Sequence, residues 1–542
     1  MMQTLTQKYR LWLILTLLFF SNSELKGQSW QDLLQLGNEN LQTITDITQN
    51  SENLIFAGAY RESLTLGNTS LSSIGEEDIF VAKQDNDGQV EVILNGGSLR
   101  GDAIDAIAID SEGNIVLAGS FWENIDFGTF QLNSDADSPK ALFLLKIDSS
   151  GQLIWSQVFT GGSIKDIYDL SLSQSNAILI GGYYGSELRF ADTLLQSEAR
   201  STAFYAKFQR DGQLQWANSI GETGNNRITA ATAFQDEYFY LGGYYDDTLK
   251  VFGQTFPANT NDADAFILSL DQNGAFRWVN KAGGVFEENP TTMVHDENGN
   301  VYMGGRLIGV LVVNDSLSIQ SRDGNADCFL IKYDSLGNAR WAQSFGGDQL
   351  QFLNDLLYQD GLLWLTGSFQ ENLQIGALQL DATNAFDGYL AQLDTAGNSL
   401  QLIELPSATG SVLPNHLSID AAGILVGGDF SGKLDLVNTQ LDAGATDFNS
   451  FIIRWNELVS STNAILYPLE NTFITPNPTG EFFIIEGLDK KALLWVIDSQ
   501  GKVIFSPQKV SGPINCSQWS NGLYYLNIRT EKAQKTILLV KN

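Results

Sequence analysis

The side chains that most often perform chemistry in enzymes are scarce in this chain. Among 542 residues there are only two histidines, His295 and His416, and two cysteines, Cys328 and Cys516. Neither histidine lies near a serine or cysteine with a nucleophile signature such as G-x-S-x-G. The cysteines are far apart and indicate neither a disulfide framework nor a zinc site. We therefore predict no catalytic residue and no cofactor-binding residue.

Carboxylates are the abundant chemical group. The chain has 63 Asp and Glu residues against 31 Lys and Arg residues, a formal net charge of −32. Pairs of carboxylates hydrolyse glycosidic bonds in many enzymes, but so many acids form so many pairs that none can be singled out. The charge argues against nucleic acid and an anionic membrane surface as partners, because neither would find a basic patch. It is typical of a soluble, self-repelling extracellular surface.

Calcium is the metal that these acids could hold. Residues 85–88 (DNDG) approach a calcium loop but lack the rest of the D-x-[DN]-x-[DN]-G pattern and its distal Glu. Four further aspartates, each two residues before an aromatic, could supply oxygen ligands or could accept hydrogen bonds from backbone amides in turns: Asp78, Asp264, Asp327 and Asp387. We expect no metal and no cofactor, with calcium as the alternative.

These residues lie on a repeat of about 62 residues. Residues 114–121 (NIVLAGSF) have six counterparts, each an apolar run followed by a small residue and a glycine. The glycines are 61 to 63 positions apart by subtraction: Gly58, Gly119, Gly182, Gly243, Gly305, Gly367 and Gly428. Each repeat contains four short strands joined by turns, enough for one antiparallel sheet. Such sheets bury both faces when they pack radially, so the sequence predicts an all-β, seven-bladed β-propeller.

The two ends of the repeat region predict how the ring closes. In the middle repeats a tryptophan follows a turn glycine by four residues, and we expect it to pack between blades: Trp155, Trp216, Trp278 and Trp341. The seventh repeat lacks its last strand, whereas residues 30–37 (WQDLLQLG) form an extra strand before the first repeat. Trp30 lies two periods before Trp155, which places it in register with the other tryptophans. We predict that this strand completes the seventh blade and protects its edge.

The repeats resemble the SBBP-type β-propeller repeats of secreted bacterial proteins. The pattern is visible at residues 264–278 (DAFILSLDQNGAFRW), 327–341 (DCFLIKYDSLGNARW) and 296–305 (DENGNVYMGG), although the first, sixth and seventh repeats lack the tryptophan. Sialidase Asp-boxes place Asp and Gly two residues apart, whereas Asp148 and Gly151 are three apart. Quinoprotein blades place Asp four residues before Gly, and the cofactor-binding residues of that family have no match here.

The two ends of the chain predict export. Residues 1–27 have a basic start, an apolar block at 11–20 and a small-residue exit, which is typical of a secretory signal peptide. The apolar block is too short to span a membrane, and we predict no transmembrane segment in the mature chain. Residues 28–457 form the propeller, 458–472 a linker, and 473–542 a small antiparallel β-sandwich of short strands and Asn-Gly turns.

This tail resembles the C-terminal sorting domain of the type IX secretion system of Bacteroidota. The matching residues are Pro476, Asn477, Pro478, Gly501, Lys502, Gly522, Tyr524 and Lys535. The resemblance implies that the type IX secretion machinery is a partner. It also implies a protein that is secreted or attached to the outer surface of the outer membrane.

We expect a non-catalytic protein that binds a glycan or a protein at the propeller faces. Four aromatics after the repeat glycines could stack on sugars if they reach the surface, or could pack between blades: Tyr183, Tyr184, Tyr244 and Tyr245. The alternatives are a polysaccharide hydrolase or lyase with acidic residues at the propeller channel, and a structural adhesion protein.

Overall fold

The computed structural model describes residues 29–37, 42–50, 52–162, 164–221, 223–259, 262–322, 324–420, 422–436, 439–456, 473–475, 482–486, 493–498, 503–509, 514–529 and 534–541. The predicted signal peptide and linker lie outside these residues. Every regular element in them is a β-strand. None of the described residues belongs to a helix that could cross a membrane. The chain divides into one compact unit of residues 28–456 and another that contains residues 457–542.

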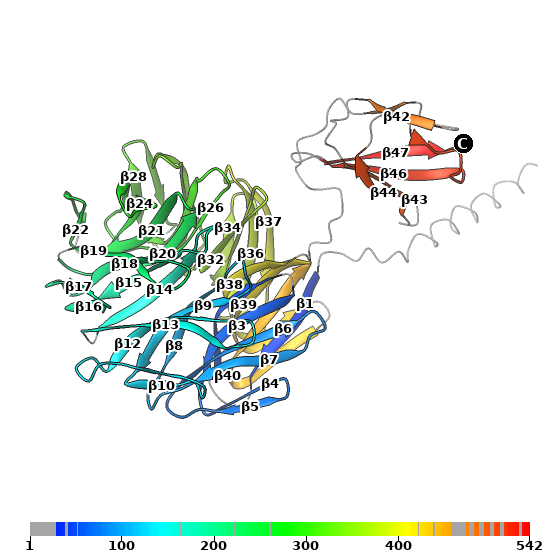
Figure 1. The fold of residues 1–542 in the computed structure, drawn as a ribbon. Coiled ribbons are helices and arrows are strands. Elements are labelled where there is room, and N and C mark those ends of the chain that lie inside the picture. Colours follow the sequence, from blue (N-terminus) through cyan, green and yellow to red (C-terminus); the bar gives the residue numbers. More distant parts are fainter. Residues whose placement is uncertain are drawn as a thin grey trace, which may run out of the picture. The chain divides into compact units, whose positions relative to one another are not determined.

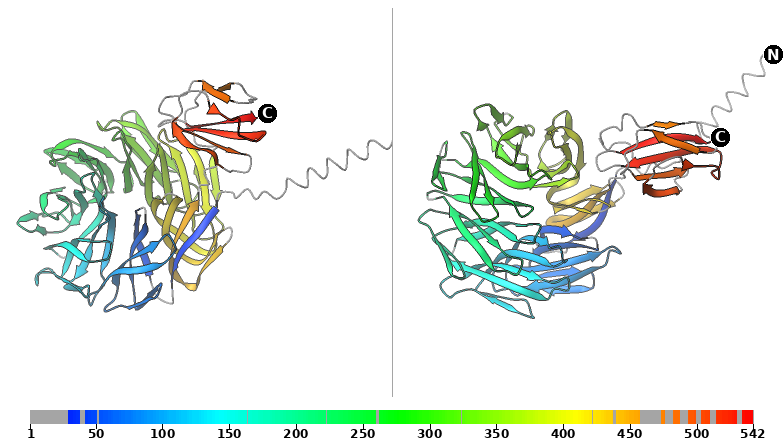
Figure 2. Two further views of the ribbon diagram at one scale, coloured as in Figure 1. Left: turned by 45° about the vertical axis from the view of Figure 1, so that its right-hand side comes forward. Right: turned by 45° about the horizontal axis from the view of Figure 1, so that its top comes forward.

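Residues 29–456 form a seven-bladed β-propeller, as predicted (Figures 1 and 2). From the innermost strand outward, the first three blades are β2 (Gln42–Gln49), β3 (Asn53–Tyr60), β6 (Asp78–Asp85) and β7 (Val90–Gly96); β8 (Ala103–Ile109), β9 (Ile115–Trp122), β12 (Lys140–Ile147) and β13 (Leu153–Gly161); and β14 (Lys165–Leu172), β15 (Ile178–Tyr184), β18 (Thr202–Phe208) and β19 (Leu214–Ile220). The next three are β20 (Asn226–Phe234), β21 (Tyr238–Tyr245), β24 (Asp264–Asp271) and β25 (Phe276–Ala282); β26 (Glu288–His295), β27 (Val301–Ile308), β30 (Ala326–Tyr333) and β31 (Ala339–Phe345); and β32 (Asp355–Gln359), β33 (Leu362–Phe369), β36 (Asp387–Asp394) and β37 (Ser399–Leu405).

A short hairpin follows the second strand in each of these six blades. The hairpins are β4 (Ser63–Leu66) with β5 (Thr69–Ser72), β10 (Asn124–Asp126) with β11 (Gln131–Asn133), β16 (Glu187–Phe190) with β17 (Thr193–Gln196), β22 (Thr248–Val251) with β23 (Gln254–Pro257), β28 (Val310–Asn314) with β29 (Leu317–Gln320), and β34 (Asn372–Ile375) with β35 (Leu378–Asp381). The third blade's hairpin also pairs with β13 through β16, and so extends the second blade's sheet to six strands.

The repeat glycines are required because a neighbouring stretch of backbone passes very close to each of them. Six of the seven face an innermost strand that carries a β-bulge, for example between Ile228 and Ala230 in β20. A Cβ atom at any of the seven glycines would lie 1.9 to 2.3 Å from a backbone carbonyl oxygen, as at Gly243 and the oxygen of Arg227 in β20. For Gly367 the oxygen is that of Phe352, just before β32. No side chain fits at such a distance. The period that defines the sequence is therefore the period of this backbone contact.

The seventh blade contains both ends of the propeller. Its strands are β38 (Ser407–Asp420), β39 (Gly423–Leu436), β40 (Thr439–Asn456) and β1 (Ser29–Leu36). Strand β1 is the outermost strand and runs antiparallel to β40, and in Figure 1 the blue β1 lies beside the orange β40. Trp30 and Leu36 are buried, with 6% and 2% of their surface exposed.

The register of β1 differs by one residue from the predicted one. Trp155, Trp216, Trp278 and Trp341 each lie opposite the third-strand residue that pairs three positions before the repeat glycine. In the seventh blade that residue is Arg454, and its partner on β1 is Gln31. Adjacent strand residues face opposite sides of a sheet. Trp30 therefore packs on Trp455, at 4.9 Å between ring centroids, and against the sixth blade, where its Nε1 donates to the Glu404 carbonyl at 3.3 Å.

The second unit, which contains residues 457–542, is a small all-β domain. One sheet contains β41 (Phe473–Thr475), β42 (Phe482–Glu486) and β45 (Ile514–Asn515), and the other contains β44 (Val503–Lys509), β43 (Leu493–Asp498), β46 (Gly522–Arg529) and β47 (Gln534–Lys541). Tyr524 lies in its core, and Gly522 and Lys535 lie on β46 and β47. Pro476, Asn477, Pro478, Gly501 and Lys502 lie outside the described residues.

Candidate functional site

Two of the four candidate tyrosines cannot contact a ligand. The side chains of Tyr184 and Tyr245 are fully buried and pack against Phe204 and Phe266 in the cores between blades. For Tyr184 and Tyr245 the structure therefore agrees with the second alternative, packing between blades, and not with a role in stacking on sugars. Successive side chains of a strand point to opposite faces of the sheet. Tyr184 and Tyr245 therefore point away from the face that Tyr183 and Tyr244 occupy.

The other two tyrosines, Tyr183 and Tyr244, enclose an arginine that the sequence did not single out. Arg227 is the second residue of the innermost strand β20, and its Cζ lies 4.1 Å from the ring centroid of Tyr183 and 5.9 Å from that of Tyr244. Its Nη1 donates to the hydroxyl of Tyr168 at 2.8 Å. The Tyr168 ring stacks on Tyr183 with centroids 5.6 Å apart. We call Tyr168, Tyr183, Arg227 and Tyr244 the Arg227 cluster.

The Arg227 cluster holds a cation without a carboxylate partner. Among the described residues, no carboxylate oxygen lies within 4.0 Å of the Arg227 guanidinium. The nearby Asp166 is occupied, because it pairs with Lys140 and accepts the Tyr183 hydroxyl at 2.7 Å. By contrast, Arg306 in the next blade pairs with Glu287 at 3.0 Å. Because Tyr168 is 38% exposed, solvent reaches the cluster.

This arrangement suits the recognition of an anion. A guanidinium binds a carboxylate through paired hydrogen bonds, and flat aromatic faces stack on sugar rings or hold the arginine plane in place. Arg227 could have been noticed from the sequence only by aligning the innermost strands, where it takes the position of Asp166 in the preceding blade.

Aspartates on the innermost strands join neighbouring blades. Three of them accept hydrogen bonds from backbone amides of the adjacent blade. The pairs are Asp46 with Ile107 at 2.8 Å, Asp169 with Ala231 at 2.7 Å, and Asp355 with Leu417 at 2.7 Å. Burial raises the pKa of Asp46 to about 8, that of Asp169 to about 7 and that of Asp355 to about 6. At Asp46 the negative charges of Asp355 and Asp169 contribute to this rise. Water still reaches 24% of the Asp46 side chain, so these groups are enclosed rather than dry.

Both histidines have a structural environment. Burial lowers the pKa of His416 to about 4, and its Nδ1 lies 3.8 Å from Oδ1 of Asp46. Burial also lowers the pKa of His295, whose Nδ1 lies 2.8 Å from the Thr232 hydroxyl. Each is neutral at pH 7 and has a defined neighbour, in keeping with a role in packing.

The aspartates considered as calcium ligands hold turns. Asp78, Asp264 and Asp327 accept the amides of Ile74, Asn259 and Arg322 at 2.9, 3.0 and 2.8 Å. Asp387 accepts the amides of Thr383 and Ser407, each at 2.8 Å. Within the described part of the chain, no three His, Cys, Asp or Glu side chains are grouped as a metal site would require.

The raised aspartate pKa values predict a pH-dependent stability. At neutral pH the folded state keeps protons that the unfolded state, with carboxylate pKa values near 4, has released. The stabilisation is therefore complete below about pH 4 and is lost as the pH rises through 6 to 8.

Asp46→Asn should reduce the fall in melting temperature between pH 5.5 and 8.5, measured by calorimetry. Asp126→Asn, at an exposed turn where the pKa is lowered, is the control and should leave the fall unchanged. An identical fall in Asp46→Asn and the parent would contradict the assignment.

The propeller and its tail define an exported protein. Residues 474–542 match the family model of the secretion system C-terminal sorting domain. The chain therefore carries a type IX sorting domain, interacts with that secretion machinery, and is secreted or displayed at the cell surface.

Comparison with known proteins adds distant likenesses. The chain is 23% identical over 471 residues to an uncharacterized WD repeat-containing protein, L264, of Acanthamoeba polyphaga mimivirus, covering 68% of this chain and 34% of that protein. It is 23% identical over 323 residues to the regulatory protein FlaEY of Caulobacter vibrioides, covering 55% of this chain and 32% of that protein. The chain thus spans about a third of the length of these curated relatives.

Among solved structures, the chain is similar to PorZ, a surface component of the type IX secretion system of Porphyromonas gingivalis. The identity is 13%, the match covers 92% of this chain and 81% of PorZ, and the TM-score is 0.21. At that TM-score we draw nothing further from the likeness.

Proposed function

We propose that this protein is a non-catalytic, exported propeller that binds an acidic glycan through the Arg227 cluster. The observation that carries the proposal is a half-buried arginine, held between tyrosine rings, with no carboxylate partner among the described residues. A uronic acid residue offers both groups that the cluster can recognise, a carboxylate for Arg227 and a ring for Tyr168 or Tyr244. We propose that binding requires no metal or cofactor.

The acidity of the whole chain does not oppose this local site. Charges separated by more than about 8 Å are largely screened at physiological salt, so a ligand at Arg227 responds mainly to its immediate surroundings. There, Lys140 neutralises Asp166. Burial and the neighbouring Asp166 raise the pKa of Asp105 to about 7, which keeps part of its population uncharged. Two further carboxylates act on Tyr244, of which Glu287 pairs with Arg306 and Asp246 accepts hydrogen bonds from Asn225. Among the described residues, Arg227 is thus the cation at this site that has no carboxylate partner.

The proposal predicts a large loss of affinity in Arg227→Gln. The ligand in the assay is an oligogalacturonate, measured by calorimetric titration, with the same oligosaccharide after reduction of its carboxylates as a neutral comparison. A hydrogen-bonded charge pair contributes about 1.5–3 kcal/mol, so the variant should bind at least about tenfold more weakly. Arg189→Gln, which removes an equally positive but half-exposed side chain on β16, is the matched control and should bind normally.

Two results would contradict the proposal. One is equal affinity for the acidic and the reduced oligosaccharide, which would mean that Arg227 does not recognise the carboxylate. The other is unchanged affinity in Arg227→Gln. EDTA should leave the affinity unchanged, and a loss of binding in EDTA would refute the cofactor-free part of the proposal.

We also propose that the repeats are of the SBBP type. Four blades place the indole of the repeat tryptophan against the turn glycine of the next blade, at Gly212, Gly274, Gly337 and Gly397. This contact gives a physical reason for the glycine and tryptophan spacing of that repeat pattern, and it supports the resemblance.

A further inference from the structure

The contact between the seventh and first blades lacks the indole that covers a turn at four other contacts of the ring. The contact between the first and second blades has no indole either, but there the backbone of Ile93 fills the place, with its carbonyl oxygen 1.8 Å from the Cβ position of Gly151. A Cβ atom on Gly212, Gly274 or Gly337 would lie 2.6 to 3.0 Å from the tryptophan of the preceding blade, and one on Gly397 would lie 3.5 Å away. The equivalent turn in the first blade is 85–88, and no described atom lies within 4 Å of the Cβ position of Gly88. We call this contact the seam.

The open space at the seam follows from the register of β1. Gln31 occupies the tryptophan position, and Trp30 points to the opposite face, against the sixth blade. A shift of one residue along a strand moves a side chain to the opposite face of the sheet. Trp30, the only tryptophan of β1, therefore cannot cover the turn at residues 85–88. The space is therefore built into the closure of the ring.

The seam also lacks, among the described residues, a hydrogen bond that a cation makes at four other contacts. In four other contacts a lysine of the third strand donates to the carbonyl of the second turn residue in the next blade: Lys83 to Ser149, Lys146 to Arg210, Lys207 to Gln272 and Lys332 to Thr395, at 2.9 to 3.4 Å. Lys146 and Lys332 also pair with an aspartate of their own blade, as the equivalent Arg454 does with Asp420 at the seam. What the seam lacks is the donation to the next turn. Among the described side chains, none donates to the carbonyl of Asn86, the second residue of that turn.

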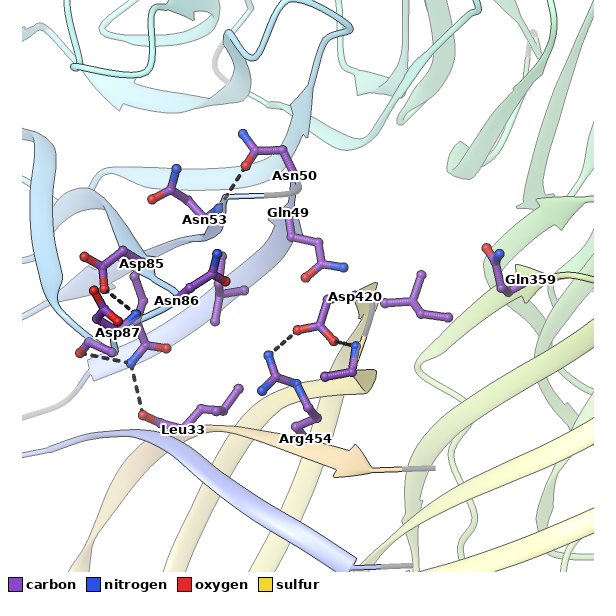
Figure 3. A pocket seen from close by; sticks show the side chains of 15 residues that line it. Leu33, Gln49, Asn50, Asn53, Asp85, Asn86, Asp87, Gln359, Asp420 and Arg454 are labelled. Atoms are coloured by element: carbon purple, nitrogen blue, oxygen red, sulfur yellow. Dashed lines mark hydrogen bonds and ion pairs between the residues drawn. The ribbon is translucent and has the colours of Figure 1, made fainter. Parts of the chain in front are cut away.

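A cavity of about 840 Å³ occupies this place. Figure 3 shows the turn that carries Asp85 and Asp87 on one side of it and the Asp420–Arg454 pair on the other. Six carboxamide side chains belong to its lining: Gln49, Asn50, Asn53, Gln84, Asn86 and Gln359. No aromatic ring is among the described lining residues. Gln49 is the last residue of β2, so the cavity lies at the end of the innermost strands opposite to the Arg227 cluster.

We propose that the seam cavity binds a neutral saccharide. Carboxamides donate and accept hydrogen bonds, as sugar hydroxyls do, and the carbonyl of Asn86, to which no described side chain donates, is a further acceptor. Three carboxylates, Asp85, Asp87 and Asp420, face a single cation that is already paired. This balance disfavours an anionic ligand, in contrast to the Arg227 cluster. The volume lies within the usual range of about 300–1,000 Å³ for small-ligand sites.

The decisive test restores the missing indole. Gln31→Trp places a tryptophan where four other blades have one, so it should fill the cavity, keep or raise the melting temperature, and weaken binding at least tenfold. The ligands are neutral trisaccharides of glucose, galactose, mannose and N-acetylglucosamine, measured by saturation-transfer NMR and calorimetry on the whole propeller with its tail. Glu91→Trp makes the same change at the equivalent position of the first blade, opposite Lys83, and should bind normally.

A second variant keeps the test valid if Gln31→Trp does not fold. Gln359→Ala removes a carboxamide from across the cavity and should weaken binding several-fold without loss of stability. Arg227→Gln should leave neutral-sugar binding intact, which separates this site from the proposed acidic-glycan site. The proposal is overturned if none of the four trisaccharides binds at millimolar concentration. It is also overturned if binding is unchanged in the folded Gln31→Trp variant.

Discussion

A chain that begins at residue 38 should be far less stable than one that begins at residue 28. The deletion removes β1, including the buried side chains of Trp30 and Leu36, and frees the edge of β40. Burial of two such side chains contributes roughly 3–6 kcal/mol, before the loss of the hydrogen bonds between β1 and β40. We expect a clear fall in melting temperature, and association of molecules through the open strand edge. Scanning calorimetry and size-exclusion chromatography measure the two effects.

Trp30→Ala in the longer chain separates the two contributions. It removes the indole but keeps the strand, so it should lower the melting temperature less than the deletion and leave the protein monomeric. Equal melting temperatures for the chains that begin at residues 28 and 38 would show that β1 does not hold the ring closed.

Gly243→Ala should be severely destabilising, whereas Gly242→Ala should be tolerated. A Cβ atom on Gly243 would lie 1.9 Å from the carbonyl oxygen of Arg227, which is backbone and cannot rotate away. A Cβ atom on Gly242 would meet its nearest neighbours, Met293 and Met303, at an ordinary 3.5 Å. We expect a loss of about 3 kcal/mol or more for Gly243→Ala, because overpacking of this kind forces the backbone to shift. Urea unfolding of the two variants measures the difference.

The neighbouring glycines make a closely matched pair. Both are buried in β21, and the two substitutions add the same methyl group one residue apart. Other blades already have a larger residue at the Gly242 position, with Ala57, Ala118 and Thr366, but every blade keeps the second glycine. Equal stability of the two variants would contradict the close-approach explanation of the repeat.

The blade count could be predicted because the repeat glycine has a local cause. Each glycine meets the carbonyl of the strand beside it, so the same constraint recurs in every blade. The register of β1 could not be predicted in this way. Repeat lengths of 61 to 63 residues leave an uncertainty of one residue, and one residue is the difference between the two faces of a strand. The same arithmetic that indicated the closing strand therefore misplaced Trp30.

The candidate sites depend on contacts that have no sequence signature. Tyr183 and Tyr184 are equivalent by residue type, and only the sheet shows that the first contacts Arg227 while the second packs against Phe204 in the core between blades. Arg227 meets Tyr168 from the preceding blade, 59 positions away. The seam cavity is marked by the absence of an indole that four other contacts have, and such an absence is recognisable only when the equivalent contacts are known.

The closure of the ring by its two ends links folding to completion of the chain. Strand β1 is synthesised first, yet its partner β40 is the last strand of the propeller and ends at Asn456. Such a long-range pairing carries a large loop-closure cost and must form late. The sorting domain begins at residue 474, only a short way beyond. A chain broken off before β40 therefore lacks both the partner that closes its ring and the sorting domain, so that closure of the propeller and the sorting signal are completed by the same last fifth of the chain.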